Sequence, residues 1–419
     1  MKSWKPYHTV WLVLGLTWVT NYLVRVGLSP ALVPIKEEFG LSHSEAGLLA
    51  TAFFYSYTAM QIPAGFIGDR IGRKIVILIS CLGWAASSLL LGFASSVKEL
   101  FALRLSMGAA EGSLFGNDRP VISAYTPKDK MGMGQGLSFT GLGTGMGFGI
   151  LLAGFIAERM GWRWIFIIFS IAAFFAAFLV WRVIKEPPRL DAERTPVSLS
   201  SLLTNRDMWC LYVGGISSVY CLWVLGTWAP TIIVETTNTE LGLSSVYSSV
   251  LGFAAIPGLF IMGALSDVMV RKGLGRKTLG GLGFLGQAIT IAFLGFAIQE
   301  RYELWILTVT IFAAGFFTWG AWGPIYALYA DLVPLQILGT AYGIGNFVNF
   351  FGSLIAPWAS GAIRDYTGSF AWACYVAAIF TAAFSLVIFA ISPAFRLGPE
   401  IRILDRQAAK ALKLSSDIS

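Results

Sequence analysis

Two long apolar runs are joined by the stretch Gly65-Phe66-Ile67-Gly68-Asp69-Arg70-Ile71-Gly72-Arg73-Lys74, a tight, basic turn punctuated by glycine. A weaker copy follows in the second half of the chain, where Gly263-Ala264-Leu265-Ser266-Asp267 precedes Arg271-Lys272-Gly273-Leu274-Gly275-Arg276-Lys277. Each copy has a Gly, an Asp four positions later and a basic, Gly-containing turn at the end of an apolar segment. This repetition indicates a chain made of two similar halves.

The composition excludes a soluble protein. Of the 419 residues, 56% are hydrophobic and 13% are charged, whereas soluble domains carry roughly 25% charged residues. Apolar runs of about twenty residues recur along the whole chain, and a helix needs this length to cross roughly 30 Å of hydrocarbon. We therefore expect a multi-pass protein of the cell membrane (plasma or inner membrane) that is surrounded by the lipid bilayer.

Hydropathy and length predict twelve membrane-spanning helices, because hydrocarbon offers no hydrogen-bond partner to the backbone of an open structure. The expected spans are 8–29, 44–67, 75–95, 99–122, 132–157, 162–184, 208–234, 245–270, 277–298, 303–330, 335–362 and 370–394. A long polar connection between the sixth and seventh spans divides the chain. The expected domains are an N-terminal six-helix bundle at 1–184, a cytoplasmic central loop at 185–207, a C-terminal six-helix bundle at 208–395 and a cytoplasmic tail at 396–419.

The positions of the basic residues predict the orientation of the chain. Of the 30 Lys and Arg residues, 21 lie at the termini and in the loops on the side of Gly65–Lys74, 6 lie in the opposite loops and 3 lie within spans. Loops rich in Lys and Arg stay in the cytoplasm, so both termini and Gly65–Lys74 are expected there. This topology and contact with lipid headgroups explain the net charge of +7, and no nucleic-acid partner is expected.

The whole chain resembles the major facilitator superfamily, because six spans lie on each side of a central loop and the turn at Gly65–Lys74 is repeated at Gly263–Lys277. The resemblance implies an all-α membrane protein in which two pseudo-symmetric six-helix bundles enclose a site near the midplane. Such a site is reached alternately from each side of the membrane. The expected functional unit is a monomer.

A narrower resemblance is to the anion:cation symporter branch of that superfamily, which carries organic and inorganic anions. Val24 is a departure, because many members of the branch have Asp there, and a coupling scheme that needs a carboxylate at this position is not expected. The stretch Gly141–Gly154 lacks the Pro of many drug/proton antiporters, which favours uptake over efflux. The matching segments are Asn21–Arg25, Tyr57 with Gln61–Gly65, Arg104 with Glu111, Tyr125–Lys130, Gly161–Trp164 and Trp228–Thr231.

Arg25 lies deep in the first span, without a carboxylate beside it in the sequence. A charge at mid-membrane costs about 2.5 to 3.5 kcal/mol on insertion scales, so we interpret it as functional. A guanidinium presents planar, paired donors that match a carboxylate. We predict that Arg25 lines a cavity and binds an anionic substrate. A structural pair with Glu111, or hydrogen bonds to backbone carbonyls, is the alternative.

Glu111 lies near the middle of the fourth span and is predicted to carry the coupled proton. Burial and a neighbouring arginine shift a carboxyl pKa in opposite directions, so together they can poise the group for proton exchange. Arg104 precedes Glu111 by seven residues, or two helical turns, and lies on the same face of the helix. It is expected to exchange partners with Glu111. Static ion pairs, and a role of Arg104 as an anchor near the outer interface, are the alternatives.

Polar and aromatic residues within the spans complete the predicted substrate site. An amide that faces lipid would lack hydrogen-bond partners, so Asn346 and Asn349, three residues apart on one helical face, are expected in the cavity. For the aromatic residues, packing in the core or against lipid is the alternative. Trp223 is a further candidate. The predicted set is Arg25, Tyr22, Tyr57, Gln61, Tyr220, Trp319, Asn346 and Asn349.

The turn Gly65–Lys74 is predicted to act as a conformational gate. Asp69 is expected to meet the positive end of a helix of the other bundle near Leu335–Gly339, and Arg73 is expected to reach Asp118. Together these contacts would latch the state that is open to the outside. The alternative is that the basic residues only fix the topology. The predicted gate residues are Gly65, Asp69, Arg70, Gly72, Arg73, Asp118, Arg119 and Asp267.

The leading hypothesis is a proton-coupled symporter that imports a small organic anion, expected to be a carboxylate, with protons. The chain has only two histidines, both near span ends, and its glycines form no phosphate-binding loop. Enzyme activity, ATP-driven transport, a cofactor and a metal site are therefore not expected. A drug/proton efflux antiporter, suggested by the 14% aromatic content, is one alternative. A non-transporting membrane sensor is an alternative of another class.

Overall fold

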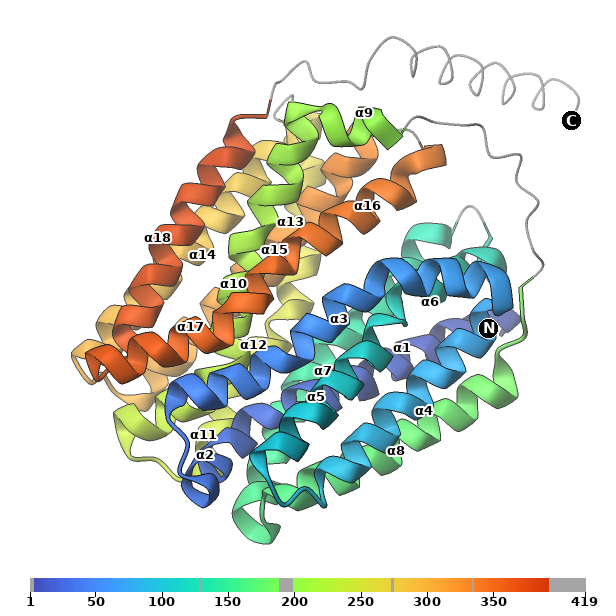
Figure 1. The fold of residues 1–419 in the computed structure, drawn as a ribbon. Coiled ribbons are helices and arrows are strands. Elements are labelled where there is room, and N and C mark those ends of the chain that lie inside the picture. Colours follow the sequence, from blue (N-terminus) through green and yellow to red (C-terminus); the bar gives the residue numbers. More distant parts are fainter. Residues whose placement is uncertain (1–3, 128–129, 188–198, 273–274, 334, 392–419) are drawn as a thin grey trace, which may run out of the picture.

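The computed structural model describes residues 4–127, 130–187, 199–272, 275–333 and 335–391. Within these ranges the chain forms helices and turns and contains no strand. Figure 1 shows that the helices form two groups, one from each half of the sequence. The predicted tail at 396–419 and positions 188–198 of the predicted central loop lie outside the described residues.

The first group contains α1 (Pro6–Val26), α2 (Leu28–Phe39), α3 (His43–Ile71), α4 (Arg73–Leu91), α5 (Val97–Gly112), α6 (Phe115–Tyr125), α7 (Met131–Met160) and α8 (Trp162–Val183). The short α9 (Leu199–Thr204) precedes the second group. That group contains α10 (Arg206–Thr237), α11 (Leu241–Ser248), α12 (Val250–Phe253), α13 (Ala255–Arg271), α14 (Arg276–Gln299), α15 (Leu304–Leu332), α16 (Leu335–Asn349), α17 (Phe351–Thr367) and α18 (Phe370–Phe389).

Every predicted span corresponds to one long helix or to one interrupted helix. The first span is divided at Gly27 into α1 and α2, the fourth at Ser113 and Leu114 into α5 and α6, and the eleventh at Phe350 into α16 and α17. The eighth span is divided into α11, α12 and α13. In the described part of the chain, nine helical segments are long and apolar enough to cross a membrane. The expected fold class is confirmed, and the protein is a multi-pass membrane protein.

The turn after α3 depends on a glycine and on an acidic side chain. Gly72 ends α3 with φ 106°, a conformation that residues with a Cβ rarely adopt. The Glu186 carboxylate then accepts hydrogen bonds from the backbone N–H groups of Arg73 (2.7 Å) and Lys74 (2.8 Å). These N–H groups begin α4 and have no partner inside the helix. Glu186 therefore caps α4 and fixes the direction in which the chain leaves the turn.

The two groups of helices approach closely at the end opposite to Gly65–Lys74, which we call the closed face. There α3 packs against α17 (Figure 1). Glycines permit this approach, since a Cβ on Gly47 would overlap the carbonyl of Pro357, and a Cβ on Gly361 would overlap the carbonyl of His43. Small residues at such crossings are typical of helices that pack within membranes.

Packing differs at the end that holds the two repeated turns, which we call the turn face. A Cβ would meet no atom within 4 Å at Gly65 on α3, Gly136 on α7, Gly263 on α13 and Gly343 on α16. The helices that carry these glycines, or the helices that they continue, meet through other glycines nearer the closed face. At the turn face, each of the two groups therefore has glycines at which a side chain would extend into open space.

Candidate functional site

A buried ion pair lies at the centre of the first group of helices. The Arg25 Nη2 atom on α1 lies 2.8 Å from Glu111 Oε2 on α5, and neither side chain is exposed to solvent. Arg25 Nε donates to the same carboxylate oxygen over 2.9 Å, and Nη2 also donates to Asn21 Oδ1 over 3.0 Å. Arg25 Nη1 and Glu111 Oε1 have no hydrogen-bond partner. The pair therefore keeps one free donor and one free acceptor in a buried position.

Glycines on α5 position Glu111 against α3. A Cβ on Gly108 would overlap the carbonyl of Phe53, and a Cβ on Gly112 would overlap the carbonyl of Tyr57. Because Gly108 precedes Glu111 by about one helical turn and Gly112 directly follows it, α5 can approach α3 closely at this level. The carboxylate is then held between α1 and α3, within reach of the Arg25 guanidinium.

Aromatic rings surround the Arg25 guanidinium. Its central carbon lies 4.5 Å from the ring centre of Tyr22, 4.9 Å from Phe53, 4.7 Å from Tyr57 and 5.9 Å from Trp223. Cation–π attraction of this kind is worth about 2 kcal/mol or more when it is desolvated. Trp223 belongs to α10, so the guanidinium lies where the two groups of helices meet.

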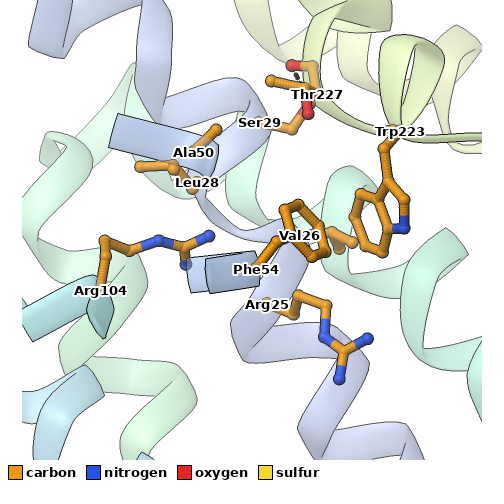
Figure 2. A pocket seen from close by; sticks show the side chains of 10 residues that line it. Arg25, Val26, Leu28, Ser29, Ala50, Phe54, Arg104, Trp223 and Thr227 are labelled. Carbon is orange, nitrogen blue, oxygen red and sulfur yellow. Dashed lines mark hydrogen bonds between the residues drawn. The ribbon is translucent and has the colours of Figure 1, made fainter. Parts of the chain in front are cut away.

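A small pocket lies beside Arg25, and Figure 2 shows residues that line it. Arg104 on α5 also borders it, and its guanidinium lies 5.0 Å from the ring centre of Phe53. Arg104 Nη1 contacts Met107 Sδ at 3.6 Å, whereas its Nε has no hydrogen-bond partner. The lining residues are Arg25, Val26, Leu28, Ser29, Ala50, Phe54, Arg104, Trp223, Gly226 and Thr227.

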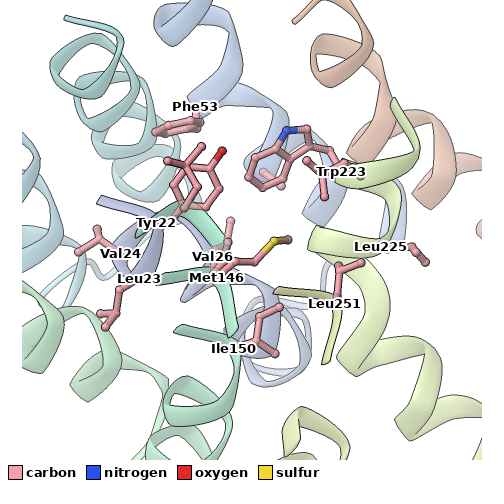
Figure 3. Close-up of a cluster of buried hydrophobic side chains, with 14 of the residues drawn as sticks. Tyr22, Leu23, Val24, Val26, Phe53, Met146, Ile150, Trp223, Leu225 and Leu251 are labelled. Carbon is pink, nitrogen blue, oxygen red and sulfur yellow. The ribbon is translucent and has the colours of Figure 1, made fainter. Parts of the chain in front are cut away.

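The surroundings of the site are apolar. Figure 3 shows Val24, Val26 and Trp223 within a cluster of buried hydrophobic side chains. Val24 has no exposed surface, so a carboxylate at this position would need its own partner inside the apolar cluster. In such surroundings an unpaired charge is costly, and the Arg and Glu side chains of the site, Arg25, Arg104 and Glu111, lie on α1 and α5.

On the turn-face side of Arg25, the two groups of helices are joined by an amide pair. Asn346 Nδ2 on α16 donates to Gln61 Oε1 on α3 over 2.9 Å, while Gln61 Nε2 has no partner. The buried Asn349 packs against Gly215 of α10, and its Oδ1 atom also lacks a partner. Trp319 donates from Nε1 to the carbonyl of Leu251 over 3.2 Å. These groups form a neutral, polar counterpart to the charged site.

The structure brings most of the predicted substrate residues to the meeting of the two groups. Tyr220 is different, because its ring packs against Phe380 of α18, with ring centres 5.4 Å apart, inside the second group. It does not border the pocket beside Arg25. Its place in the substrate site stays a prediction. Sequence reasoning gave no role to Asn21 and Phe53, although Asn21 precedes Arg25 by four residues and so shares its helical face.

Residues 14–275 match the family model described as Major Facilitator Superfamily, which covers more than half of the chain. The chain belongs to the Major Facilitator Superfamily. One curated relative, a D-galactonate transporter from Escherichia coli O6:H1, is 25% identical over 414 residues, which span 90% of this chain and 94% of the relative. A probable sulfoacetate transporter from Cupriavidus necator is 27% identical over 390 residues, which span 87% and 89% of the two chains. This member of the superfamily is thus similar to transporters of organic anions, as its sequence motifs predicted.

A solved structure shows the same fold. A bacterial homolog of the human lysosomal transporter Spinster, in an inward-facing and unoccupied conformation, superimposes with a TM-score of 0.81 and 18% sequence identity. The match covers 95% of this chain and all of the other. The two-bundle architecture of the superfamily is therefore present, and the two groups of helices are the N-terminal and C-terminal bundles.

The predicted gate residues of this superfamily member form pairs within each bundle. Arg73 contacts Asp69 on its own turn and donates from Nη1 to the Gly116 carbonyl over 2.9 Å. The expected contact of Arg73 with Asp118 is not formed. Asp118 is buried and accepts instead from Trp18 Nε1 (2.6 Å) and from Arg119 Nη2 (2.9 Å). The break before α6 explains this difference, because it turns the Gly116 carbonyl toward Arg73.

The second turn repeats this arrangement inside the C-terminal bundle. Arg276 lies 2.8 Å from Asp267 and 2.8 Å from Asp331, and it also donates to Ser266. In each turn, an Asp near the end of one helix thus pairs with an Arg at the start of the next, over four residues for Asp69 and nine for Asp267. The expected partner of Asp69 near Leu335–Gly339 falls largely outside the residues whose side chains are described.

Proposed function

We propose that this protein is a proton-coupled symporter that imports a small organic anion, a carboxylate, by alternating access. The observation that carries the proposal is the buried Arg25–Glu111 pair at the meeting of the bundles, with one free donor on Arg25 and one free acceptor on Glu111. The names of the relatives, D-galactonate transporter and sulfoacetate transporter, support an organic anion as substrate.

Arg25 serves as the anion-binding group in this proposal. Its guanidinium is held by Glu111 and Asn21, and Nη1 remains available. A substrate carboxylate that approaches Nη1 meets the negative charge of Glu111 at short range. Repulsion between two buried carboxylates is relieved when Glu111 takes up a proton. Protonation of Glu111 and binding of the anion therefore favour each other, which is the requirement for symport.

Arg104 provides a second cation for the deprotonated carboxylate. It lies two turns from Glu111 on the same face of α5, and its Nε has no hydrogen-bond partner. When the substrate occupies Arg25, a movement of Glu111 toward Arg104 keeps a carboxylate paired after its proton has left. The buried charge is thus compensated in each step.

The remaining substrate contacts come from neutral groups near Arg25. Tyr22 and Tyr57 lie directly over the guanidinium, and the Gln61–Asn346 pair adds one unpaired amide nitrogen. Hydroxyl groups of a polar acid can be hydrogen-bonded by such amides. We assign Tyr22, Tyr57, Gln61 and Asn346 to this role, with Trp319 and Asn349 behind them.

Alternating access is supported by the packing at the two faces. Glycines close the bundles together at the closed face, whereas Gly65, Gly136, Gly263 and Gly343 have space above them at the turn face. We propose that these four glycines become the close contacts when the turn face shuts. The gate residues Asp69, Arg70, Gly72, Arg73, Asp118, Arg119 and Asp267 then hold that second state, with the turn face in the cytoplasm and one chain as the working unit.

Purified protein in proteoliposomes tests the proposal. Labelled D-galactonate, sulfoacetate and a set of related acids are offered with an inward proton gradient. We expect accumulation of at least one acid above its external concentration, and loss of that accumulation when an ionophore collapses the gradient. Saturable binding without any flux would contradict transport and indicate a sensor. Efflux of amphiphilic drugs in a resistance assay, without uptake of acids, would contradict the assigned substrate class.

A further inference from the structure

A charged cluster joins the two bundles at the closed face, away from Arg25. The His43 ring at the start of α3 contacts two carboxylates of the C-terminal bundle: Nδ1 lies 2.8 Å from Asp365 Oδ1 on α17, and Nε2 lies 2.7 Å from Glu235 Oε1 on α10. Asp365 also accepts from the backbone N–H groups of His43 (3.1 Å) and Ser44 (2.7 Å). Arg364 donates from Nε to Glu235 Oε2 over 2.8 Å.

The geometry at the ring identifies the form of the imidazole that fits. A neutral imidazole has one N–H donor, whereas an imidazolium donates from both nitrogens. Both nitrogens of His43 face carboxylate oxygens, so only the imidazolium satisfies both contacts. The ring also packs against Trp228 and Phe370, with ring centres 5.8 Å and 5.5 Å away. The side chain is therefore held in position between its two acceptors.

The other charged groups that face His43 are Lys36, Arg364, Glu235 and Asp365, with Glu45 nearby. Lys36 on α2 and Arg364 on α17 supply two cations to the same carboxylates, and Glu45 is bound to Ser42 at the start of α3. Partial burial raises the pKa of Asp365, but hydrogen bonds from Ser44 and His43 outweigh this effect, so its pKa lies below the usual value. Asp365 therefore stays ionised wherever an unperturbed imidazole changes its charge, between about pH 5 and 8.

We propose that His43 is a pH-dependent latch between the bundles: its protonated ring holds the closed face shut, and loss of that proton allows this face to open. The inference goes beyond the proposed transport function, because it concerns the conformational equilibrium of the protein without substrate. It also uses a different titratable group from Glu111.

The direction of the pH effect follows from the two contacts. The imidazolium can donate to both carboxylates across the bundles, whereas a neutral ring can donate to only one, so the protonated ring stabilises the closed state. Acidification therefore favours the closed face, and alkalinisation favours its opening. If the closed face lies outside the cell, as the basic residues predict, an acidic exterior holds the transporter shut on that side.

Distance measurements between spin labels test the latch. Lys98 and Glu300 are exposed at the closed face, one on each bundle, so Lys98→Cys and Glu300→Cys carry the labels, with Cys210→Ser to remove the half-buried native thiol. Distances are recorded without substrate at about pH 5.5 and about pH 8, on either side of the usual imidazole titration. We expect the ratio of long to short distances to rise by about tenfold, the effect of one charged hydrogen bond.

Two variants decide whether His43 is responsible. In His43→Gln the ring cannot become charged, so the long distances should already be populated at the acidic pH and should not increase with pH. Asp365→Asn keeps an acceptor oxygen and the shape of the side chain but removes the negative charge that favours the imidazolium, so it should reduce the pH response. In a Glu111→Gln background the response of His43 should persist. An unchanged distribution in the parent protein, or an equal pH response in His43→Gln, would overturn the proposal.

Discussion

The centres of the two bundles share an architecture but differ in charge. Inside the N-terminal bundle lie four buried side chains of the charged types, Arg25, Arg104, Glu111 and Asp118. At the corresponding depth of the C-terminal bundle, the described buried polar groups are neutral; for example, Gln287 Nε2 donates to Thr318 Oγ1 over 2.8 Å and to the Ser218 carbonyl over 3.3 Å. The two halves thus retain one fold with different chemistry.

This difference suggests that the two bundles contribute different groups to transport. Charges that exchange partners during a cycle need to stay close to one another, because separating a buried pair is costly. Placing Arg25, Arg104 and Glu111 on α1 and α5 keeps them within one bundle while the other bundle moves. The C-terminal bundle contributes neutral groups such as Trp223 and Asn346, which can be desolvated and rehydrated at lower cost. Movement between the bundles then need not carry a charge across their interface.

The largest effect is expected for Arg25→Ala. Removal of the cation leaves Glu111 buried without a partner, which destabilises the protein by about 3 to 5 kcal/mol and abolishes binding of the anion. Thermal unfolding and equilibrium binding measure the two effects. In the double variant Arg25→Met with Glu111→Gln, no unpaired charge remains, so stability should recover while binding stays lost. Unchanged affinity in Arg25→Ala would remove Arg25 from the site.

Arg104→Met should have an intermediate effect on transport. Its effect on stability should be opposite in sign to that of Arg25→Ala. Arg104 is buried and contacts Met107 and the Phe53 ring, and it forms no ion pair with a carboxylate among the described residues. Replacement by an apolar side chain of similar length removes a desolvated charge, so thermal stability should stay equal or increase. Proton-driven uptake should fall about tenfold, which corresponds to about 1.4 kcal/mol. A loss of stability equal to that of Arg25→Ala would contradict the different roles of the two arginines.

The smallest effect is expected in the C-terminal bundle, from Asn346→Ala. It removes an amide that we assign to the substrate and the hydrogen bond that holds Gln61. The loss of one neutral hydrogen bond to the substrate costs about 0.5 to 1.5 kcal/mol, so affinity should fall about twofold to tenfold. Tyr220→Phe is the matched control, because Tyr220 packs against Phe380 and should leave affinity unchanged. Competition binding with the transported acid measures both. A larger loss in Tyr220→Phe than in Asn346→Ala would reverse the assignment of these residues.

The sequence predicted the fold through the length of its apolar runs, and it predicted the charged site through the rarity of charges within them. The sequence identified Arg25, Arg104 and Glu111 because a charged residue inside a membrane span is costly and therefore indicates a function. Their pairing stayed open, because residues on different spans have no fixed spacing in the sequence. The position of α5 depends on Gly108 and Gly112, whose close contact with α3 only the structure shows.

Other details depend on packing that the sequence does not encode locally. An aromatic residue in a span can face the cavity, the core or lipid, and the sequence does not decide between these places for Tyr220, whose ring packs against Phe380 of α18. The contact of Arg73 with Asp118 was expected on a continuous fourth helix. The break at Ser113 and Leu114 redirects α6, so that Asp118 meets Trp18 instead. Phe53 was missed because its role arises from stacking on two arginines of other helices.

The central claim is that Glu111 couples proton movement to anion transport in the N-terminal bundle. Glu111→Gln tests it most directly, with uptake into proteoliposomes measured in two ways for whichever acid the parent protein accumulates. Glutamine imitates the protonated carboxyl and can still accept from Arg25. We expect the variant to lose accumulation driven by a proton gradient and to retain exchange of internal for external substrate. Equal loss of both activities, or accumulation at the level of the parent protein, would contradict the claim.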